Sequence, residues 1–189
     1  MTLLSSAPSR RGFLGGLAAG LILTGCVNPV GSAGPSIIDA RVAQTLDYMY
    51  RAYPSSQNLA DKAAGMLVMP VVTEATIGFG GSYGRGALLV NGATVDYYSA
   101  AQASVGLQIG AQQYAHVLFF MTPDALQLFR TSPGFSAGAG VEYATPDQGL
   151  SALASTTTTL SPVIGVVFGQ QGLLAGASIE GTKYTRILP

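Results

Sequence analysis

The sequence predicts an α+β protein, a single domain with an antiparallel, β-rich curved sheet or barrel-like core, N-terminal helices and one short internal helix. Three observations predict this class. Apolar residues fall at helical spacing only near the start of the domain. From Gly65 onwards, short apolar or alternating runs are interleaved with many of the 25 glycines. The dipeptide Asn91-Gly92 between two such runs is typical of a tight β-hairpin.

The composition excludes several classes of protein. Charged residues make up 10% of the 189 residues, against about 25% in an ordinary soluble protein, and the mean hydropathy is +0.38. Disordered chains are polar and rich in charge, and nonspecific nucleic-acid binding uses many cations, so neither is expected. A single cysteine excludes a disulfide within the chain. A membrane protein or a compact domain attached to a membrane remains.

Residues 1–25 have the pattern of an export signal. Arg10 and Arg11 precede an apolar run of 11 residues, 13–23, which is the length of a signal core and shorter than the about 20 residues of a membrane span. The alternative is a permanent spanning helix, but Asn28 and Pro29 interrupt its continuation. Residues 9–14 also resemble a twin-arginine export signal, although the general route stays open.

The segment Leu23-Thr24-Gly25-Cys26 resembles a bacterial lipobox, in which the cysteine is acylated with palmitate-type chains and becomes the first residue. The alternative for Cys26 is a buried free cysteine. Processing there would leave 189 − 25 = 164 residues with a formal charge of 7 − 9 = −2. The expected location is the cell envelope, and Val27 after the cysteine favours the periplasmic face of the outer membrane in a Gram-negative cell.

A tether over residues 26–35 is expected to lead into a domain over residues 36–189. Its first helix has one apolar face and ends before Pro54. Two interpretations stay open for this face: packing against its own domain, or contact with the bilayer or a partner. The face is formed by Ile38, Val42, Leu46, Met49 and Tyr53.

The rest of the chain predicts a second short helix over 56–64, then strands, one internal helix and more strands. Thr122 and Pro123 begin the internal helix, which passes through Phe129 and ends near Arg130. Residues 156–159 fit a strand or an exposed loop, and a terminal hairpin is expected to turn near residues 170–172. The expected strands are 66–69, 76–82, 86–90, 93–99, 104–110, 114–121, 135–143, 162–168 and 173–179.

The sequence carries few groups for chemistry, so no enzyme, cofactor or metal site is expected. The only histidine, His116, lies in an apolar run and is expected in the core or on a strand surface. No Gly-x-Ser-x-Gly motif accompanies it, and no His/Cys cluster suits zinc. The glycine-rich segment 78–86 lacks the lysine of a phosphate loop. A glycosidase-type carboxylate pair assembled by the fold stays open.

An ordered set of segments resembles the SYLF domain, a lipid-binding module related to Ysc84, over roughly residues 37–188. The resemblance implies membrane-lipid binding without catalysis, with phosphoinositides as ligands and actin as a partner in eukaryotic members. Bacterial members often carry a lipoprotein signal. The matching N-terminal segment is formally neutral here, whereas eukaryotic members have a basic one. The matching segments are 63–70, 80–90, 97–99, 106–112, 120–126 and 172–183.

These observations predict a lipid-anchored bacterial envelope lipoprotein whose SYLF-like domain binds membrane lipid. Anionic or phosphoinositide-like lipids are the ligands that the resemblance implies. The alternative is a scaffolding lipoprotein that binds another envelope protein through a sheet edge and has no lipid ligand. A hydrolase is the third hypothesis. The candidate lipid contacts are Ile38, Arg41, Val42, Leu46, Met49, Arg51, Lys183 and Arg186.

Overall fold

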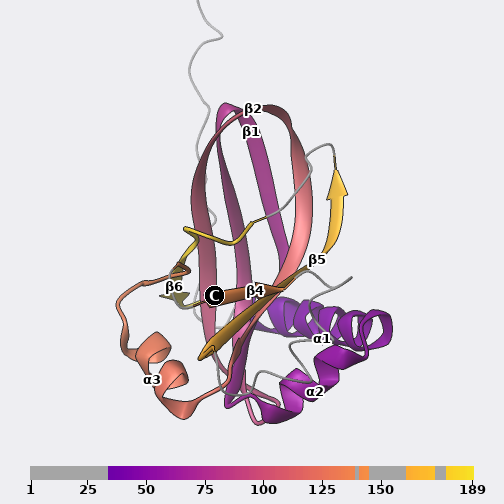
Figure 1. Cartoon of the computed structure of the whole chain (residues 1–189), viewed down its shortest axis with the longest axis vertical. Coiled ribbons are helices and arrows are strands. Elements are labelled where there is room, and N and C mark those ends of the chain that lie inside the picture. The colour runs from indigo at the N-terminus through magenta and orange to yellow at the C-terminus, as the bar shows by residue number, and fades with distance from the viewer. Residues whose placement is uncertain (1–33, 139–140, 145–160, 173–177) are drawn as a thin grey trace, which may run out of the picture.

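The computed structural model describes residues 34–138, 141–144, 161–172 and 178–189 (Figure 1). It confirms an α+β domain with two N-terminal helices and one internal helix. Cys26 and the predicted signal lie outside the described residues. The elements are α1 (Gly34–Ala52), α2 (Ser55–Lys62), β1 (Gly65–Val90), β2 (Ala93–Phe120), α3 (Pro123–Thr131), β3 (Phe135–Ser136), β4 (Val141–Ala144), β5 (Val163–Gly172) and β6 (Lys183–Ile187).

The six strands form one curved sheet in the order β3-β6-β2-β5-β4, with β1 paired to β2 off this path. Four of the strand pairings are antiparallel, and β4 with β5 is parallel. The sheet is open, so of the two predicted forms the structure has the curved sheet.

The β1–β2 hairpin dominates the domain and is longer than predicted. The sequence suggested three strands before the turn and three after it, whereas each side is one continuous strand, of 26 and 28 residues. Pro70 lies where the register shifts between Met69 and Val72, because a bulge tolerates a residue without an N–H. The predicted turn is confirmed, since Asn91 and Gly92 have φ of 51° and 77°.

The hairpin folds back on itself, and glycines make this possible. Gly78 has φ of 75° at a register shift, and it divides β1 into a first arm, 65–77, and a second arm, 79–90. The arms then pack closely: a Cβ on Gly86 would lie 2.0 Å from the carbonyl oxygen of Val68, and one on Gly84 would lie 2.7 Å from that of Val71. Figure 1 shows the resulting arch above the helices.

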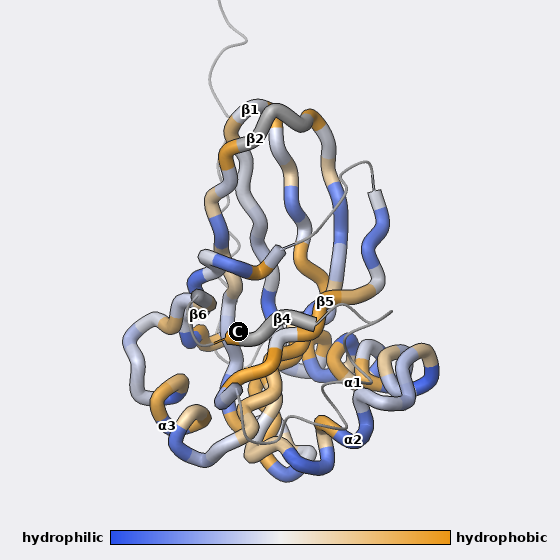
Figure 2. The backbone as a smooth tube through the Cα atoms, viewed as in Figure 1, coloured by the Kyte–Doolittle hydropathy of each residue, from blue (hydrophilic) through white to orange (hydrophobic). Residues whose placement is uncertain are grey.

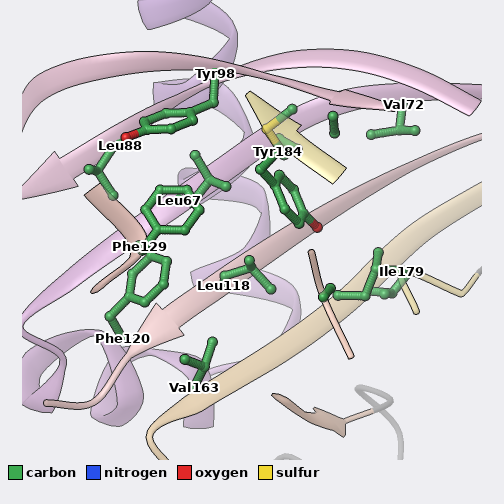
Figure 3. Packing of buried hydrophobic residues seen from close by; sticks show 14 of the residues in the cluster. Leu67, Val72, Leu88, Tyr98, Leu118, Phe120, Phe129, Val163, Ile179 and Tyr184 are labelled. Atoms are coloured by element: carbon green, nitrogen blue, oxygen red, sulfur yellow. The ribbon is translucent and has the colours of Figure 1, made fainter. Parts of the chain in front are cut away.

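Two hydrophobic clusters cover the two faces of the sheet. Alternation along the strands separates them: Val68 and Val117 face α1, whereas Leu67 and Leu118 face the opposite cluster. Figure 3 shows this second cluster, and Figure 2 shows hydrophobic residues concentrated in the lower part of the molecule, around the helices. The core therefore lies at the base of the hairpin.

The internal helix α3 is confirmed with its predicted cap. The Thr122 hydroxyl accepts a hydrogen bond from the Ala125 amide at 3.2 Å, and Pro123 occupies the first turn. Phe129 is the buried residue of this helix, so α3 is attached to the second cluster mainly through one ring.

The C-terminal strands differ from the prediction. Residues 135–143 contribute two short strands, β3 and β4, in place of one. β5 continues through the predicted turn at 170–172 and pairs with β2 and β4, while β6 pairs with β2 and β3. Residues 156–159 and most of the predicted last hairpin strand lie outside the described residues. Pairing between strands far apart in sequence decides this part, and alternation cannot reveal it.

Candidate functional site

The apolar face of α1 packs against the sheet. Ile38, Val42 and Met49 are buried, and Leu46 is half-buried against the same cluster. Of the two interpretations of this helix, the structure favours packing on its own domain. A lipid contact through these side chains stays a prediction, and it would require α1 to leave the sheet.

Two of the four candidate cations are already engaged with carboxylates. Arg51 forms an exposed ion pair with Asp47, four residues before it on α1. The guanidinium of Arg186 contacts the buried carboxylate of Asp96, which Arg130 also contacts at 3.3 Å. Asp96 thereby joins β2, α3 and β6, so this charge cluster has a clear role in holding the fold.

The candidate cations do not form one site. Arg41 and Arg51 lie on α1, which packs on β1, whereas Lys183 and Arg186 lie on β6 beside β2. Lys183 is exposed, and its side chain lies against the backbone of Gly134, where a Cβ would be 2.7 Å from Cε.

Arg41 instead shares a groove with a cation that sequence reasoning missed. The groove, of about 180 Å³, lies between the start of α1 and the two arms of β1, and Arg41 and Arg85 both line it. No acidic side chain is among the described residues that line it. Its other lining residues are Ile37, Ile38, Pro70, Val71, Thr73, Tyr83 and Gly84.

The groove carries positive charge because the nearby carboxylate of Asp39 is bound to hydroxyl groups of β2. Asp39 accepts hydrogen bonds from the hydroxyls of Thr94 and Tyr97, both at 2.9 Å. Within the described part of the chain, neither Arg41 nor Arg85 has an ion-pair partner, and both are exposed. The groove therefore offers two guanidinium groups to an anion, although α1 as a whole carries balanced charge.

Apolar side chains border these arginines. Ile37 and Tyr83 are about half exposed and Val71 is 38% exposed. A groove with cations and exposed apolar groups suits an amphiphile, whose anionic head and hydrocarbon part need different neighbours. Arg85 alternates with Tyr83 on the exposed side of β1, a signal that the glycine-rich composition of this segment obscured.

The family model of Ysc84, described as Las17-binding protein actin regulator, matches residues 101–186. Over these residues the chain is similar to the Ysc84 family. The SYLF resemblance is thereby confirmed over this range, which is shorter than the predicted 37–188. No curated protein matches the chain. Arg41 and Arg85 precede the matched residues, so the groove lies beside the Ysc84-family region.

His116, inside the region that matches the Ysc84 model, lies in the core, one of the two positions that the sequence predicted for it. Its ring is fully buried, and its Nε2 lies 2.8 Å from the Tyr184 hydroxyl. Burial lowers the pKa of His116 from its ordinary 6.5 to about 3, so the ring is neutral at physiological pH. A neutral, solvent-free imidazole paired with a tyrosine stabilises the junction of β2 and β6.

The described residues supply neither a metal cluster nor a spanning helix. Within the described ranges, no three His, Cys, Asp or Glu side chains are placed to hold a metal ion. None of the helices formed by these residues is long and apolar enough to cross a membrane.

The burial of His116 predicts acid sensitivity of the Ysc84-family domain. The folded state keeps the ring neutral, whereas the unfolded chain binds a proton below pH 6.5, so stability is lost as pH falls from about 6.5 towards 3. Between pH 7 and pH 5 the free energy of unfolding should fall by about 2 kcal/mol. Urea titrations of the wild type and His116→Gln measure this difference. Equal losses in the two proteins would contradict the assignment to His116.

Proposed function

We propose that this protein is a lipid-anchored bacterial envelope lipoprotein whose Ysc84-family domain binds membrane lipid. The observation that carries the proposal is the groove, where Arg41 and Arg85, without an ion-pair partner among the described residues, lie beside the exposed Ile37 and Tyr83. An anionic headgroup accepts hydrogen bonds from the two guanidinium groups, and the apolar rim lies against the upper part of the acyl chains.

The proposed anchor supports this orientation. Gly34, the first residue of α1, would lie eight positions after the acylated Cys26 (34 − 26 = 8). An extended chain spans at most about 3.5 Å per residue, so the start of α1 stays within about 28 Å of the anchor. The groove lies at this end of α1. Several acyl chains give stable attachment, and the domain then needs only weak affinity for headgroups.

Vesicle flotation of a chain that begins at Val27, and so has no anchor, tests lipid binding. Each cation near an anionic surface contributes about 1 kcal/mol, so Arg41→Gln with Arg85→Gln should weaken binding to phosphatidylglycerol-containing vesicles about 30-fold. Arg51→Gln is the matched control, because Arg51 is exposed on the same helix but paired with Asp47. If the double variant floats like the wild type, the groove is not the lipid site.

The anchor has a separate readout in the same study. In cells fed labelled palmitate, the full chain should take up label and Cys26→Ser should not. Equal labelling of both proteins would remove Cys26 as the acylated residue.

The second candidate function is binding of another envelope protein. The family description, a Las17-binding protein, favours it, because that relative is named for a protein partner. It predicts that the Val27 chain stays in the soluble fraction with every vesicle, and that the anchored protein co-purifies with one specific partner.

A further inference from the structure

The arch of the β1–β2 hairpin carries four large apolar side chains that point into solvent. Ile77 and Ile109 are 76% and 73% exposed, and Phe79 and Val105 are each 81% exposed. Ile77 pairs with Ile109 and Phe79 with Val105 across the two strands, so the four side chains form one cluster around the bend at Gly78. Figure 2 shows hydrophobic residues at this end of the molecule, far from the core.

The interior of the same arch is polar. Thr76 is buried, and its hydroxyl lies 3.5 Å from that of Ser104. The Gln112 amide donates a hydrogen bond to the Glu74 carboxylate at 2.8 Å. At the base of the same strands the distribution of polar and apolar side chains is the opposite, because Leu67 and its neighbours bury apolar side chains in the interior. The arch is therefore apolar outside and polar inside, the arrangement expected of a surface whose surroundings are hydrocarbon.

The outer end of the arch carries no charged residue, and the carboxylate of Glu74 below it accepts the hydrogen bond from Gln112. Residues 75–84 and 97–123 contain no Asp, Glu, Lys or Arg. An unpaired charge on this surface would oppose entry into hydrocarbon, so the absence of charged residues from these stretches removes the main barrier to entering a bilayer. The nearest cation along the second arm is Arg85, in the groove.

We infer that the arch of the β1–β2 hairpin inserts into one leaflet of the membrane, with Ile77, Phe79, Val105 and Ile109 among the acyl chains. The inference rests on the proposed function, because it assigns to the lipid-binding domain the depth at which it sits. Arg41 and Arg85 then lie at the level of the lipid phosphates, and Tyr83 lies between them and the inserted cluster.

The dimensions agree with insertion into one leaflet. Phe79 and Arg85 are six residues apart on one arm, or about 20 Å at 3.3 Å per residue. One leaflet with its headgroups measures roughly 20–22 Å. With the arginines at the phosphates, the cluster reaches the hydrocarbon of the near leaflet without crossing to the other.

A bilayer fits this surface better than a second copy of the chain. Four such side chains present on the order of 500 Å² of apolar area, below the roughly 800 Å² per partner of a stable protein interface. A bilayer needs no complementary shape, and the arch has cations directly behind its apolar end.

The chain has no tryptophan, so one introduced indole reports its own surroundings. The experiment uses the full chain purified from membranes and reconstituted into vesicles of phosphatidylethanolamine and phosphatidylglycerol. In these vesicles the indole of the Phe79→Trp protein should fluoresce at a shorter wavelength than it does in the same protein in buffer without lipid. Lipids that are brominated on their acyl chains should quench this fluorescence at least twofold. Leu188→Trp is the control, because Leu188 is 89% exposed but lies away from the arch. It follows β6, which pairs with residues 97–101 of β2.

A second variant separates insertion from a folding defect. Ile77→Ser with Ile109→Ser in the Phe79→Trp protein should keep the circular dichroism spectrum and reduce the quenching to the level of Leu188→Trp. Quenching of Phe79→Trp no stronger than that of Leu188→Trp overturns the inference. A blue shift without quenching by brominated lipid, together with a cross-linked dimer, also overturns it, in favour of self-association.

The two proposals can fail separately. If flotation depends on Arg41 and Arg85 while Phe79→Trp stays unquenched, the domain binds headgroups without inserting its arch. If the anchored chain shows quenching while the Val27 chain floats with no vesicle, the arch enters a membrane only when acyl chains hold it there, and lipid binding by the isolated domain fails.

Discussion

Replacing Gly86 by alanine should strongly destabilise the folded domain. The new Cβ would lie 2.0 Å from the carbonyl oxygen of Val68 and 2.5 Å from Sδ of Met69. The methionine side chain could move, but the backbone of Val68 is held by its pairing with Val117 near the base of the hairpin. The two arms of β1 would have to separate, and the core clusters lie beside this contact. We expect a loss above about 4 kcal/mol, a large part of the 5–15 kcal/mol that stabilises a typical domain.

Urea denaturation followed by circular dichroism measures this loss. Gly138→Ala is the matched control, because no atom lies within 4 Å of the Cβ position there and Gly138 does not need a positive φ. It should change the free energy of unfolding by no more than about 0.5 kcal/mol. A Gly86→Ala protein with the wild-type midpoint would mean that the arms are not in contact.

Replacing Phe129 by alanine should cost about 3–5 kcal/mol, the usual range for removing a buried phenylalanine. The ring centroid lies 4.7 Å from those of Tyr98 and Phe120 and 5.2 Å from that of Phe135. Figure 3 shows the rings of Tyr98, Phe120 and Phe129 in this cluster. Phe129 is also the buried residue of α3, so the substitution removes both a core ring and the main attachment of the helix. We expect α3 to detach at denaturant concentrations at which the sheet is still folded.

Two measurements separate these effects. Hydrogen exchange of the α3 amides reports the detachment of the helix, and denaturation of the whole domain reports the loss of the core ring. Leu128→Ala is the control on the same helix, since Leu128 is 63% exposed. It should leave both measurements nearly unchanged. Similar exchange of α3 in the Phe129→Ala and Leu128→Ala proteins would show that other contacts hold the helix.

Short sequence patterns predicted the local helices and the hairpin turn, and they also predicted where several single residues lie. Helical spacing predicted α1, the Thr122-Pro123 pair predicted the start of α3, and Asn91-Gly92 predicted the hairpin turn. His116 was expected in the core or on a strand surface because its neighbours are apolar, and the structure places it in the core. Each of these depends on residues within a few positions, where backbone sterics, capping and alternation act directly.

The candidate site was harder to predict. The apolar face of α1 reads the same whether it meets a sheet or a membrane, and the structure places it on the sheet. Arg41 was predicted as a site residue, but its companion Arg85 lies 44 positions later (85 − 41 = 44) and reaches the groove only because β1 folds back. Arg186 looked available, yet it is paired with a carboxylate 90 positions earlier (186 − 96 = 90).

Local sequence patterns therefore predicted the fold class, the helices and the hairpin turn, and the composition alone gave the scarcity of charge. The continuous 26-residue strand, its folding back on itself, the groove and the exposed apolar arch depended on long-range packing. The physical reason is visible at Gly86 and Val68, which are 18 positions apart (86 − 68 = 18) and approach so closely that a Cβ on Gly86 would lie 2.0 Å from the Val68 carbonyl oxygen. A glycine pattern shows that such an approach is allowed, and only the three-dimensional arrangement shows which backbone it approaches.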